Sequence, residues 1–169
     1  GQELDLEEYD QWLLLRQYRH ALDRAVVYLT ARARSRKELE TKLLQSGYRP
    51  ATVEMVLYKL ESNQLISDEE FARQWVEARS GRTLGKRRIA QELARKGISR
   101  EEADAALDQV DEEDEADVCR RAAEKLATKY TRDEPPKAQQ KLIAALVRRG
   151  FGWEDARAAA KQALEDEEE

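Results

Sequence analysis

The segment Leu39-Glu-Thr-Lys-Leu43-Leu-Gln-Ser-Gly47-Tyr48 decides the fold, because its pattern occurs three times in the 169-residue chain. It recurs as Ile89-x3-Leu93-x3-Gly97-Ile98 and as Leu142-x3-Leu146-x3-Gly150-Phe151, with the glycines 50 and then 53 residues apart. Apolar residues four apart share one face of a helix, and the following glycine can adopt the left-handed conformation that ends the helix. The chain therefore contains three diverged copies of one helical unit.

Another helix is expected before and after each of these segments. In the second copy, the capping boxes Ser67-Asp-Glu-Glu70 and Ser99-Arg-Glu-Glu102 start the first and third helices, and the middle helix is expected to begin near Thr83. In the first copy, Ser35-Arg-Lys-Glu38 caps the middle helix and Pro50 starts the third. Each copy is therefore a three-helix unit.

The third copy departs most from the pattern. Its middle helix is expected to begin at Pro135-Pro136, and the acidic run 111–117 (DEEDEAD) before it is interpreted as a solvated spacer with helix-start charges. Its last helix has a shallow apolar face, so we expect this helix to be the least firmly held of the three. That face consists of Ala156, Ala159, Ala160 and Ala163.

These patterns predict an all-α protein with three tandem three-helix repeats forming an elongated, curved helical array. A unit of about 45–50 residues is small for an independent core, so the repeats should pack on their neighbours. The predicted domains are an N-terminal helical extension over 1–20, repeats over 21–66, 67–110 and 111–165 (the last including the acidic linker), and an acidic tail over 166–169.

The N-terminal extension is expected to cover the first repeat with its apolar side chains. No large apolar stripe then remains exposed, so we predict a monomer. The apolar residues of the extension are Leu4, Leu6, Tyr9, Trp12, Leu13 and Leu15.

Composition narrows the class of protein. Charged residues make up 38% of the chain and the net charge is −5, which is typical of exposed helices. The sequence has no run of 18 apolar residues, so no membrane span is predicted. The acidic start lacks the basic and apolar regions of a secretion signal, and Cys119 is the single cysteine. We therefore expect a protein of the reducing cytoplasm.

No enzymatic centre is predicted. The single histidine, His20, is interpreted as a surface or packing residue, and no nucleophile-bearing turn, phosphate loop or set of spaced Cys and His metal ligands is present. The acidic run lacks the glycine of a calcium loop. Cys119 lies on a helical stripe with Val118 and Ala122, where a free cysteine is usually a core residue. We expect no catalytic residue, metal or cofactor.

Basic residues gather in the turn between the first and middle helices of all three copies. Although the chain is acidic overall, residues 24–110 have a net charge of +4. If the repeats stack regularly, these turns lie along one edge of the array, which could contact DNA or an acidic partner. The turns contain Arg32, Arg34, Arg36 and Lys37 in the first copy, Arg79, Arg82, Lys86, Arg87 and Arg88 in the second, and Lys129, Arg132 and Lys137 in the third.

The middle helix of the second copy adds a geometric expectation. If Ile89 and Leu93 point inward, Arg87, Gln91 and Arg95 lie on the opposite face, each four residues from the next, with Arg88 beside them. Such a stripe could contact phosphates or carboxylates of a partner. For any single arginine, an ordinary solvated helix face with a few local ion pairs is the favoured interpretation. The repetition in three copies favours a contact surface.

Three stretches of the sequence resemble the RecX family. Arg32-Ala-Arg-Ser-Arg-Lys-Glu-Leu39, followed by Gly47-Tyr48, is similar to the opening repeat of RecX proteins. Leu65-Ile-Ser-Asp-Glu-Glu-Phe-Ala72 resembles the start of their second repeat, and Gly85-Lys-Arg-Arg-Ile-Ala-Gln-Glu-Leu93 is similar to their most recognisable stretch. The resemblance runs from about Ala21 to Leu164.

This resemblance implies a non-enzymatic bacterial modulator of the RecA recombinase, in the inhibitory direction. RecX proteins are understood to bind the RecA nucleoprotein filament in its groove and to limit its growth, ATPase and strand exchange. Such a protein regulates DNA repair, recombination and the SOS response. A rod with a basic edge is compatible with this function, because several weak contacts to adjacent filament subunits add up.

Two other functions stay open from the sequence. The chain could be an autonomous helical protein that binds single- or double-stranded DNA through its basic turns. It could also be a helical scaffold that binds neither RecA nor DNA. Binding to the filament, with naked DNA as control, separates the three.

Overall fold

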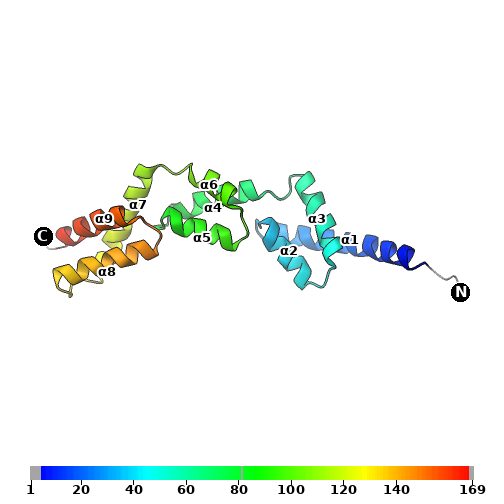
Figure 1. Ribbon diagram of the computed structural model, residues 1–169, viewed down its shortest axis with the longest axis horizontal. Coiled ribbons are helices and arrows are strands. Elements are labelled where there is room, and N and C mark those ends of the chain that lie inside the picture. The colour runs from blue at the N-terminus through cyan, green and yellow to red at the C-terminus, as the bar shows by residue number, and fades with distance from the viewer. Residues whose placement is uncertain (1–4, 81, 168–169) are drawn as a thin grey trace. The chain divides into compact units, whose positions relative to one another are not determined.

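The structure is a computed structural model that describes residues 5–80 and 82–167. Within these residues it contains nine α-helices and no β-strand, which confirms the predicted all-α class (Figure 1). The helices follow one another as three sets of three, as the repeated pattern predicts. They are α1 (Leu6–Ala31), α2 (Arg36–Gln45), α3 (Pro50–Ser62), α4 (Asp68–Ser80), α5 (Lys86–Arg95), α6 (Arg100–Leu107), α7 (Glu112–Ala127), α8 (Pro135–Arg148) and α9 (Trp153–Asp166).

The chain divides into two compact units. The first contains the described residues up to Phe71 together with Lys96–Ile98, and the second contains Ala72–Arg95 and the described residues from Ser99 onward. The first repeat thus stands in one unit, while most of the second repeat shares a unit with the third. The limits of the individual repeats stay a prediction.

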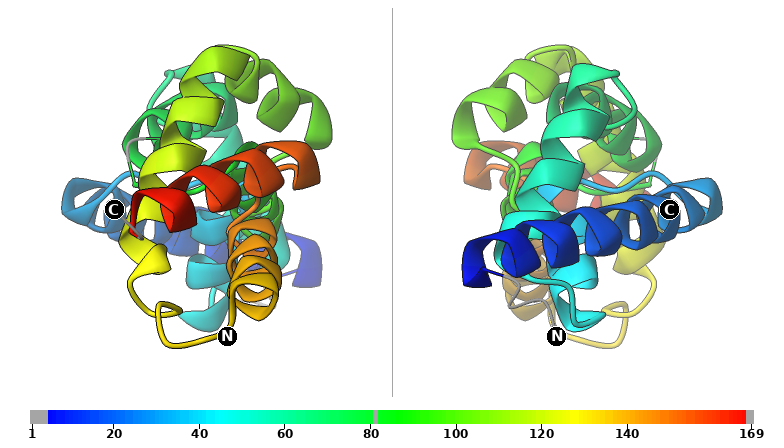
Figure 2. Two further views of the ribbon diagram at one scale, coloured as in Figure 1. Left: turned by 90° about the vertical axis from the view of Figure 1, so that its left-hand side faces the viewer. Right: turned by 90° about the vertical axis from the view of Figure 1, so that its right-hand side faces the viewer.

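The first unit is built on contacts among α1, α2 and α3 (Figures 1 and 2). α3 crosses α1, and α2 packs on both. Pro50 begins α3, as expected, and Ser35 caps α2 by accepting a hydrogen bond from the amide of Glu38 at 3.1 Å. The core of this unit consists of Ala21, Ala25, Leu39, Leu43, Val53, Val56, Leu57, Leu60 and Ile66.

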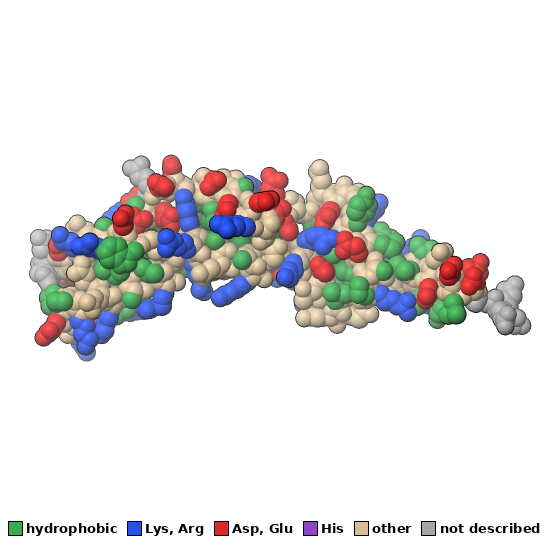
Figure 3. Space-filling model, in the orientation of Figure 1, with side chains coloured by type: hydrophobic (Ala, Val, Ile, Leu, Met, Phe, Trp, Pro, Cys, Tyr) green, Lys and Arg blue, Asp and Glu red, His purple; other side chains and the backbone are tan. Residues whose placement is uncertain are grey.

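The N-terminal extension continues into the first helix of the unit without a break. α1 runs from Leu6 to Ala31, and Leu4 lies outside the described residues. Exposed hydrophobic side chains follow this helix beside the acidic side chains at its start (Figure 3). The expectation that the extension covers the first repeat is therefore wrong for Leu6, Tyr9, Trp12 and Leu15, which are 46–78% exposed. The oligomeric state stays a prediction.

Within the second unit, α5 packs on α6, and α7, α8 and α9 pack on one another. α5 begins at Lys86 rather than near Thr83, because Thr83 has a positive φ of 58° and belongs to the preceding turn. The four alanines of α9 are buried at 0–8% exposure against α7 and α8. The prediction of a loosely held last helix is thus wrong, because small side chains let helices approach closely.

The acidic run is part of a helix instead of a spacer. α7 begins at Glu112, so all of 111–117 except its first residue, Asp111, is helical. Asp111 is the N-cap residue, and negative charge is favourable in the first turn of a helix. No helix in the described residues is long and apolar enough to cross a membrane.

Candidate functional site

The four predicted site residues of the first basic turn differ in their surroundings. Arg32 donates a hydrogen bond to Glu38, and the Nε of Arg34 donates to the Tyr28 carbonyl at 3.2 Å. Lys37 is exposed, and its aliphatic part lies against Gly97. Arg36 is tied into a network of ion pairs and is described separately below.

Arg36 joins α2 to α3 and to the start of α4. Its guanidinium pairs with Glu54 at 2.6 Å and also with Glu61, and its backbone N–H donates to Asp68 Oδ1 at 2.8 Å. A third carboxylate, that of Glu40, lies 3.6 Å away on the same helix. A guanidinium held by three carboxylates has few donors left for a partner, so Arg36 is mainly a structural residue.

In the second basic turn, Glu92 of α5 holds two of the predicted cations. Its carboxylate accepts a hydrogen bond from Trp75 Nε1 at 3.0 Å and pairs with Arg79 Nε at 3.3 Å. Arg88 Nε lies 3.9 Å from the same carboxylate, and the Arg79 guanidinium lies over the Trp75 ring at 4.7 Å. Arg79 and Arg88 are thus partly neutralised and fixed in position.

The starts of the first two middle helices are held by two similar contacts each. One partner is a carbonyl just before the glycine that ends the next middle helix, and the other is a carboxylate from the first helix of the next repeat. In the first unit, Ser35 Oγ donates to the Lys96 carbonyl at 2.6 Å, and the first amide of α2 is bound by the Asp68 carboxylate. In the second unit, the Gly85 amide donates to the Arg149 carbonyl at 2.9 Å. The first amide of α5, that of Lys86, donates to Glu115 Oε1 at 2.8 Å. The two junctions hold the first residues of α2 and α5, which directly follow the basic turns.

The outward stripe on α5 has the geometry that its spacing predicts. Ile89 and Leu93 are buried at no more than 1% exposure, while Arg87, Gln91 and Arg95 are exposed. Within the described part of the chain, no carboxylate pairs with Arg87 or Arg95. The same holds for Arg82, an exposed residue of the preceding turn. Arg82, Arg87 and Arg95, like the exposed Lys37 of the first basic turn, are therefore available to an external anion.

Sequence reasoning selected the cations and missed the carboxylates that hold them. Glu38, Glu92 and Glu115 decide which cations stay available, and each is only partly exposed. One signal for Glu92 was visible, since Arg88 and Glu92 have the i, i+4 spacing of a helical ion pair. Glu115 bonds a residue 29 positions away, which no local pattern reveals.

The residues considered for chemistry have structural positions. Cys119 is fully buried, and burial, with the negative charges of Asp155 and Glu115, raises the pKa of its thiol to about 12. The reactive thiolate is therefore scarce at neutral pH. His20 is exposed on α1. Among the residues that the structure describes, no three His, Cys, Asp or Glu side chains are grouped as metal ligands.

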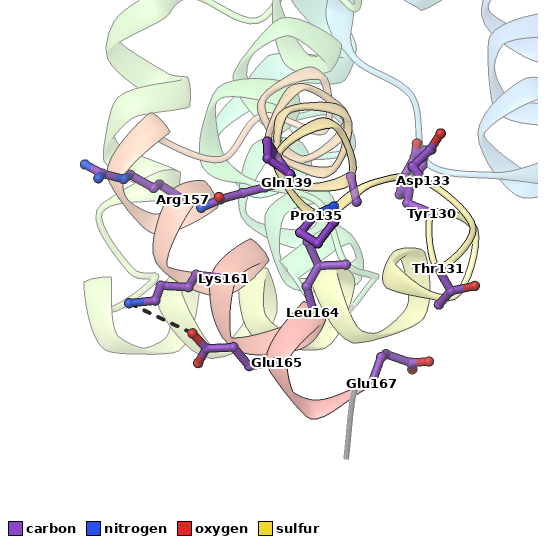
Figure 4. A pocket seen from close by; sticks show the side chains of 12 residues that line it. Tyr130, Thr131, Asp133, Pro135, Gln139, Arg157, Lys161, Leu164, Glu165 and Glu167 are labelled. Atoms are coloured by element: carbon purple, nitrogen blue, oxygen red, sulfur yellow. Dashed lines mark ion pairs between the residues drawn. The ribbon is translucent and has the colours of Figure 1, made fainter.

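A cavity of about 520 Å³ opens in the third repeat between the start of α8 and α9 (Figure 4). Pro135 and Leu164 form apolar parts of its wall, and Arg157 and Lys161 lie along α9. Lys161 is close to Glu165, 4.0 Å away. None of the predicted site residues lines this cavity.

Comparison with protein families identifies all three repeats. The models of the first, second and third three-helix domains of RecX match residues 21–60, 67–107 and 112–160. The regulatory protein RecX of Chlorobium limicola is 39% identical over 139 residues, which are 79% of this chain and 86% of that protein. The regulatory protein RecX of Listeria monocytogenes is 31% identical over 97% of this chain and 60% of its own length.

Solved structures agree. A crystal structure of regulatory protein RecX superposes with a TM-score of 0.82 at 28% identity, covering 98% of this chain and 80% of that one. The crystal structure of RecX from Lactobacillus salivarius superposes with a TM-score of 0.79 at 25% identity, covering 88% of this chain and 97% of that one.

Proposed function

This chain belongs to the RecX family of regulatory proteins, and we propose that it is a non-enzymatic inhibitor of the RecA recombinase. In this proposal it binds the RecA–DNA filament in the cytoplasm as a monomer, without metal or cofactor. It limits the growth of the filament, its ATPase and strand exchange, and so regulates DNA repair, recombination and the SOS response.

The observation that carries this proposal is the exposed stripe on α5. Arg87 and Arg95 have no carboxylate partner within the described residues, and Gln91 stands between them with its amide exposed. Phosphates and carboxylates are the groups that such donors bind. A nucleoprotein filament offers both groups side by side. Because Glu92 and Glu115 tie α5 to α4 and α7, the backbone that presents the stripe needs no ordering on binding.

The proposal is tested by the DNA-dependent ATPase of RecA with increasing amounts of this protein. The wild type should lower the ATPase rate in a stoichiometric manner. Arg87→Glu combined with Arg95→Glu should weaken inhibition by tenfold or more while the helical content stays unchanged. No effect of the wild type at saturation would contradict the function.

A matched control separates the stripe from net charge. Arg121→Glu with Lys125→Glu makes the same charge change on exposed residues of α7. This control should inhibit almost as well as the wild type. Equal loss in both double variants would mean that the α5 stripe has no special role. Co-sedimentation with naked DNA runs in parallel: binding to DNA with no effect on RecA would favour an autonomous DNA-binding protein, and binding to neither target would favour a scaffold.

A further inference from the structure

In the second repeat, two cations lie near an aromatic residue, and one carboxylate bonds all three side chains. Trp75 of α4 lies against Arg79, and the carboxylate of Glu92 bonds Trp75, Arg79 and Arg88. Glu92 stands five residues before Gly97, the glycine that ends its middle helix. The Glu92 carboxylate thus compensates the positive charge of Arg79 and Arg88 within the protein itself.

The first repeat has a related cluster around Tyr28 of α1, where α2 packs on α1 (Figure 1). Three cations surround its ring: Arg24 at 6.0 Å, Arg34 at 5.6 Å and Lys42 at 5.3 Å from the centroid. The Tyr28 hydroxyl lies 2.9 Å from Ser46 Oγ. Arg24 comes from α1, Arg34 from the basic turn and Lys42 from α2, so three separate segments converge on one ring.

In the part of the chain that the structure describes, no carboxylate is ion-paired with a cation of this cluster. Lys42 stands five residues before Gly47, which is the position that Glu92 has in the second repeat. One position of the repeat therefore carries a negative charge in the second copy and a positive charge in the first.

The helix C-termini nearby offset only part of the positive charge of this cluster. Tyr28 lies in the last turn of α1 and Ser46 is the C-cap of α2. A helix C-terminus contributes about half a negative charge, so two of them offset about one of the three cations. The hydrogen bond with Ser46 and the positive charges of Arg24 and Lys42 lower the pKa of Tyr28 against the opposing effect of burial. A positive potential thus remains at the ring.

We infer that the Tyr28 cluster binds a phosphate group of a nucleic-acid backbone, which supplies from outside the negative charge that Glu92 supplies in the second repeat. The surroundings favour a polymer over a single ion. Arg16 and His20 continue the line of Arg24 along α1 at intervals of four residues, and both line a second cavity of about 390 Å³ that also borders Ser46. A row of cationic and polar side chains matches the repeated charge of a sugar–phosphate chain.

This binding needs no RecA and involves other residues than the α5 stripe, so it goes beyond the proposed function. Its test is the fluorescence anisotropy of a labelled oligothymidylate at several salt concentrations, without RecA. Lys42→Glu installs the carboxylate that the second repeat has at the same position. It should weaken binding at least tenfold at low salt, and it should reduce the slope of log affinity against log salt, since roughly 0.7 of a unit is lost for each phosphate contact removed.

Lys59→Glu is the matched control, because Lys59 is an exposed cation of α3 in the same unit. It makes the same change in net charge and should weaken binding less than about threefold. Arg24→Gln is a second variant at the site and should also lower both the affinity and the salt slope. Circular dichroism of each variant verifies that it folds. If Lys42→Glu and Lys59→Glu weaken binding equally, the Tyr28 cluster is no phosphate site and the inference is overturned.

Two competitors identify the source of the anion. Inorganic phosphate at constant ionic strength should displace the oligonucleotide only at millimolar or higher concentration, since it offers one contact of the row. Polyglutamate at equal charge concentration should compete much less than unlabelled oligothymidylate. Equal competition by polyglutamate would assign the cluster to an acidic protein and overturn the inference. A failed ATPase assay with RecA would leave these results unaffected, so the two proposals fail separately.

Discussion

The glycines that end the middle helices share a positive φ but differ in what surrounds them. Gly47 has φ +91° with no atom within 4 Å of the position a Cβ would take. Gly150 has φ +94°, and a Cβ there would lie 2.3 Å from the Arg88 amide nitrogen. The backbone of α5 therefore packs directly on the turn at Gly150, whereas the turn at Gly47 faces open space.

This difference predicts unequal effects of the same substitution. Gly47→Ala should lower the free energy of unfolding by about 1–2 kcal/mol, which is the cost of the left-handed conformation alone. Gly150→Ala adds a backbone clash and should cost roughly 3 kcal/mol or more. Urea unfolding of the two variants measures both values. Equal losses would mean that the Gly150 contact is not close in solution.

Glu38 provides a prediction on pH. Burial has the largest single effect and raises the pKa of Glu38, but the hydrogen bonds from Arg32 and Lys96 outweigh it, so the pKa is lowered overall. The folded-state pKa thus lies below the unfolded value of about 4.3. The resulting stabilisation is complete above that value and is lost as the pH falls through the folded-state pKa.

Glu38→Gln should therefore be less stable than the wild type at pH 7, and the difference should shrink as the pH falls to about 3. Urea unfolding at a series of pH values measures this difference. Glu101→Gln, at an exposed residue of α6, should show little difference at any pH. A gap between wild type and Glu38→Gln that is constant with pH would show that the carboxylate is not stabilised in the fold.

At the scale of elements, the sequence predicted the helices well and their junctions poorly. The pattern around Leu43 and Gly47 and the caps at Ser35 and Pro50 are local, so they could be read directly. The bond from Ser35 to Lys96 joins residues 61 positions apart. Similarity between repeats shows that they share a fold, but it does not show which helix start meets which turn.

The candidate site divides in the same way. The exposed face of Arg87 and Arg95 follows from helical spacing, and the structure bears it out. The ion pairs of Arg36 and Arg79 depend on carboxylates from other helices, so their availability could not be predicted. The opposite charges of Lys42 and Glu92 are visible in the sequence, whereas the convergence of three cations on Tyr28 depends on the packing of α2 on α1.

The acidic run offers a test at this scale. Glu115 is a partly exposed residue of α7 that binds the first amide of α5 at 2.8 Å. Glu115→Ala should lower the free energy of unfolding by about 1–2 kcal/mol, because a charged hydrogen bond to a helix start is lost. Asp114→Ala, at the exposed neighbouring position, should cost roughly 0.5 kcal/mol or less. If thermal or urea unfolding gives equal losses, the acidic run acts by its general charge.

At the scale of the whole molecule, three repeats in sequence are folded as two units. The first unit has its own core around Leu39, Leu43 and Leu57, and the third repeat has a core around Leu142 and Phe151. Lys96–Ile98 belong to the first unit although they follow α5, which lies in the second. The unit of cooperative unfolding should therefore follow the packing and not the repeat limits.

Leu57→Ala tests this division by native-state hydrogen exchange. Leu57 is fully buried in the first unit, and its truncation should cost about 2–5 kcal/mol. The amides of α1, α2 and α3 should lose protection by that amount, while those of α7, α8 and α9 should keep the wild-type rates. The amides of Ile98 and Gly97 decide between packing and sequence order. If packing contacts define the unfolding unit, these two amides should lose protection together with those of α3. If the sequence repeat defines it, they should stay as protected as the amides of α5.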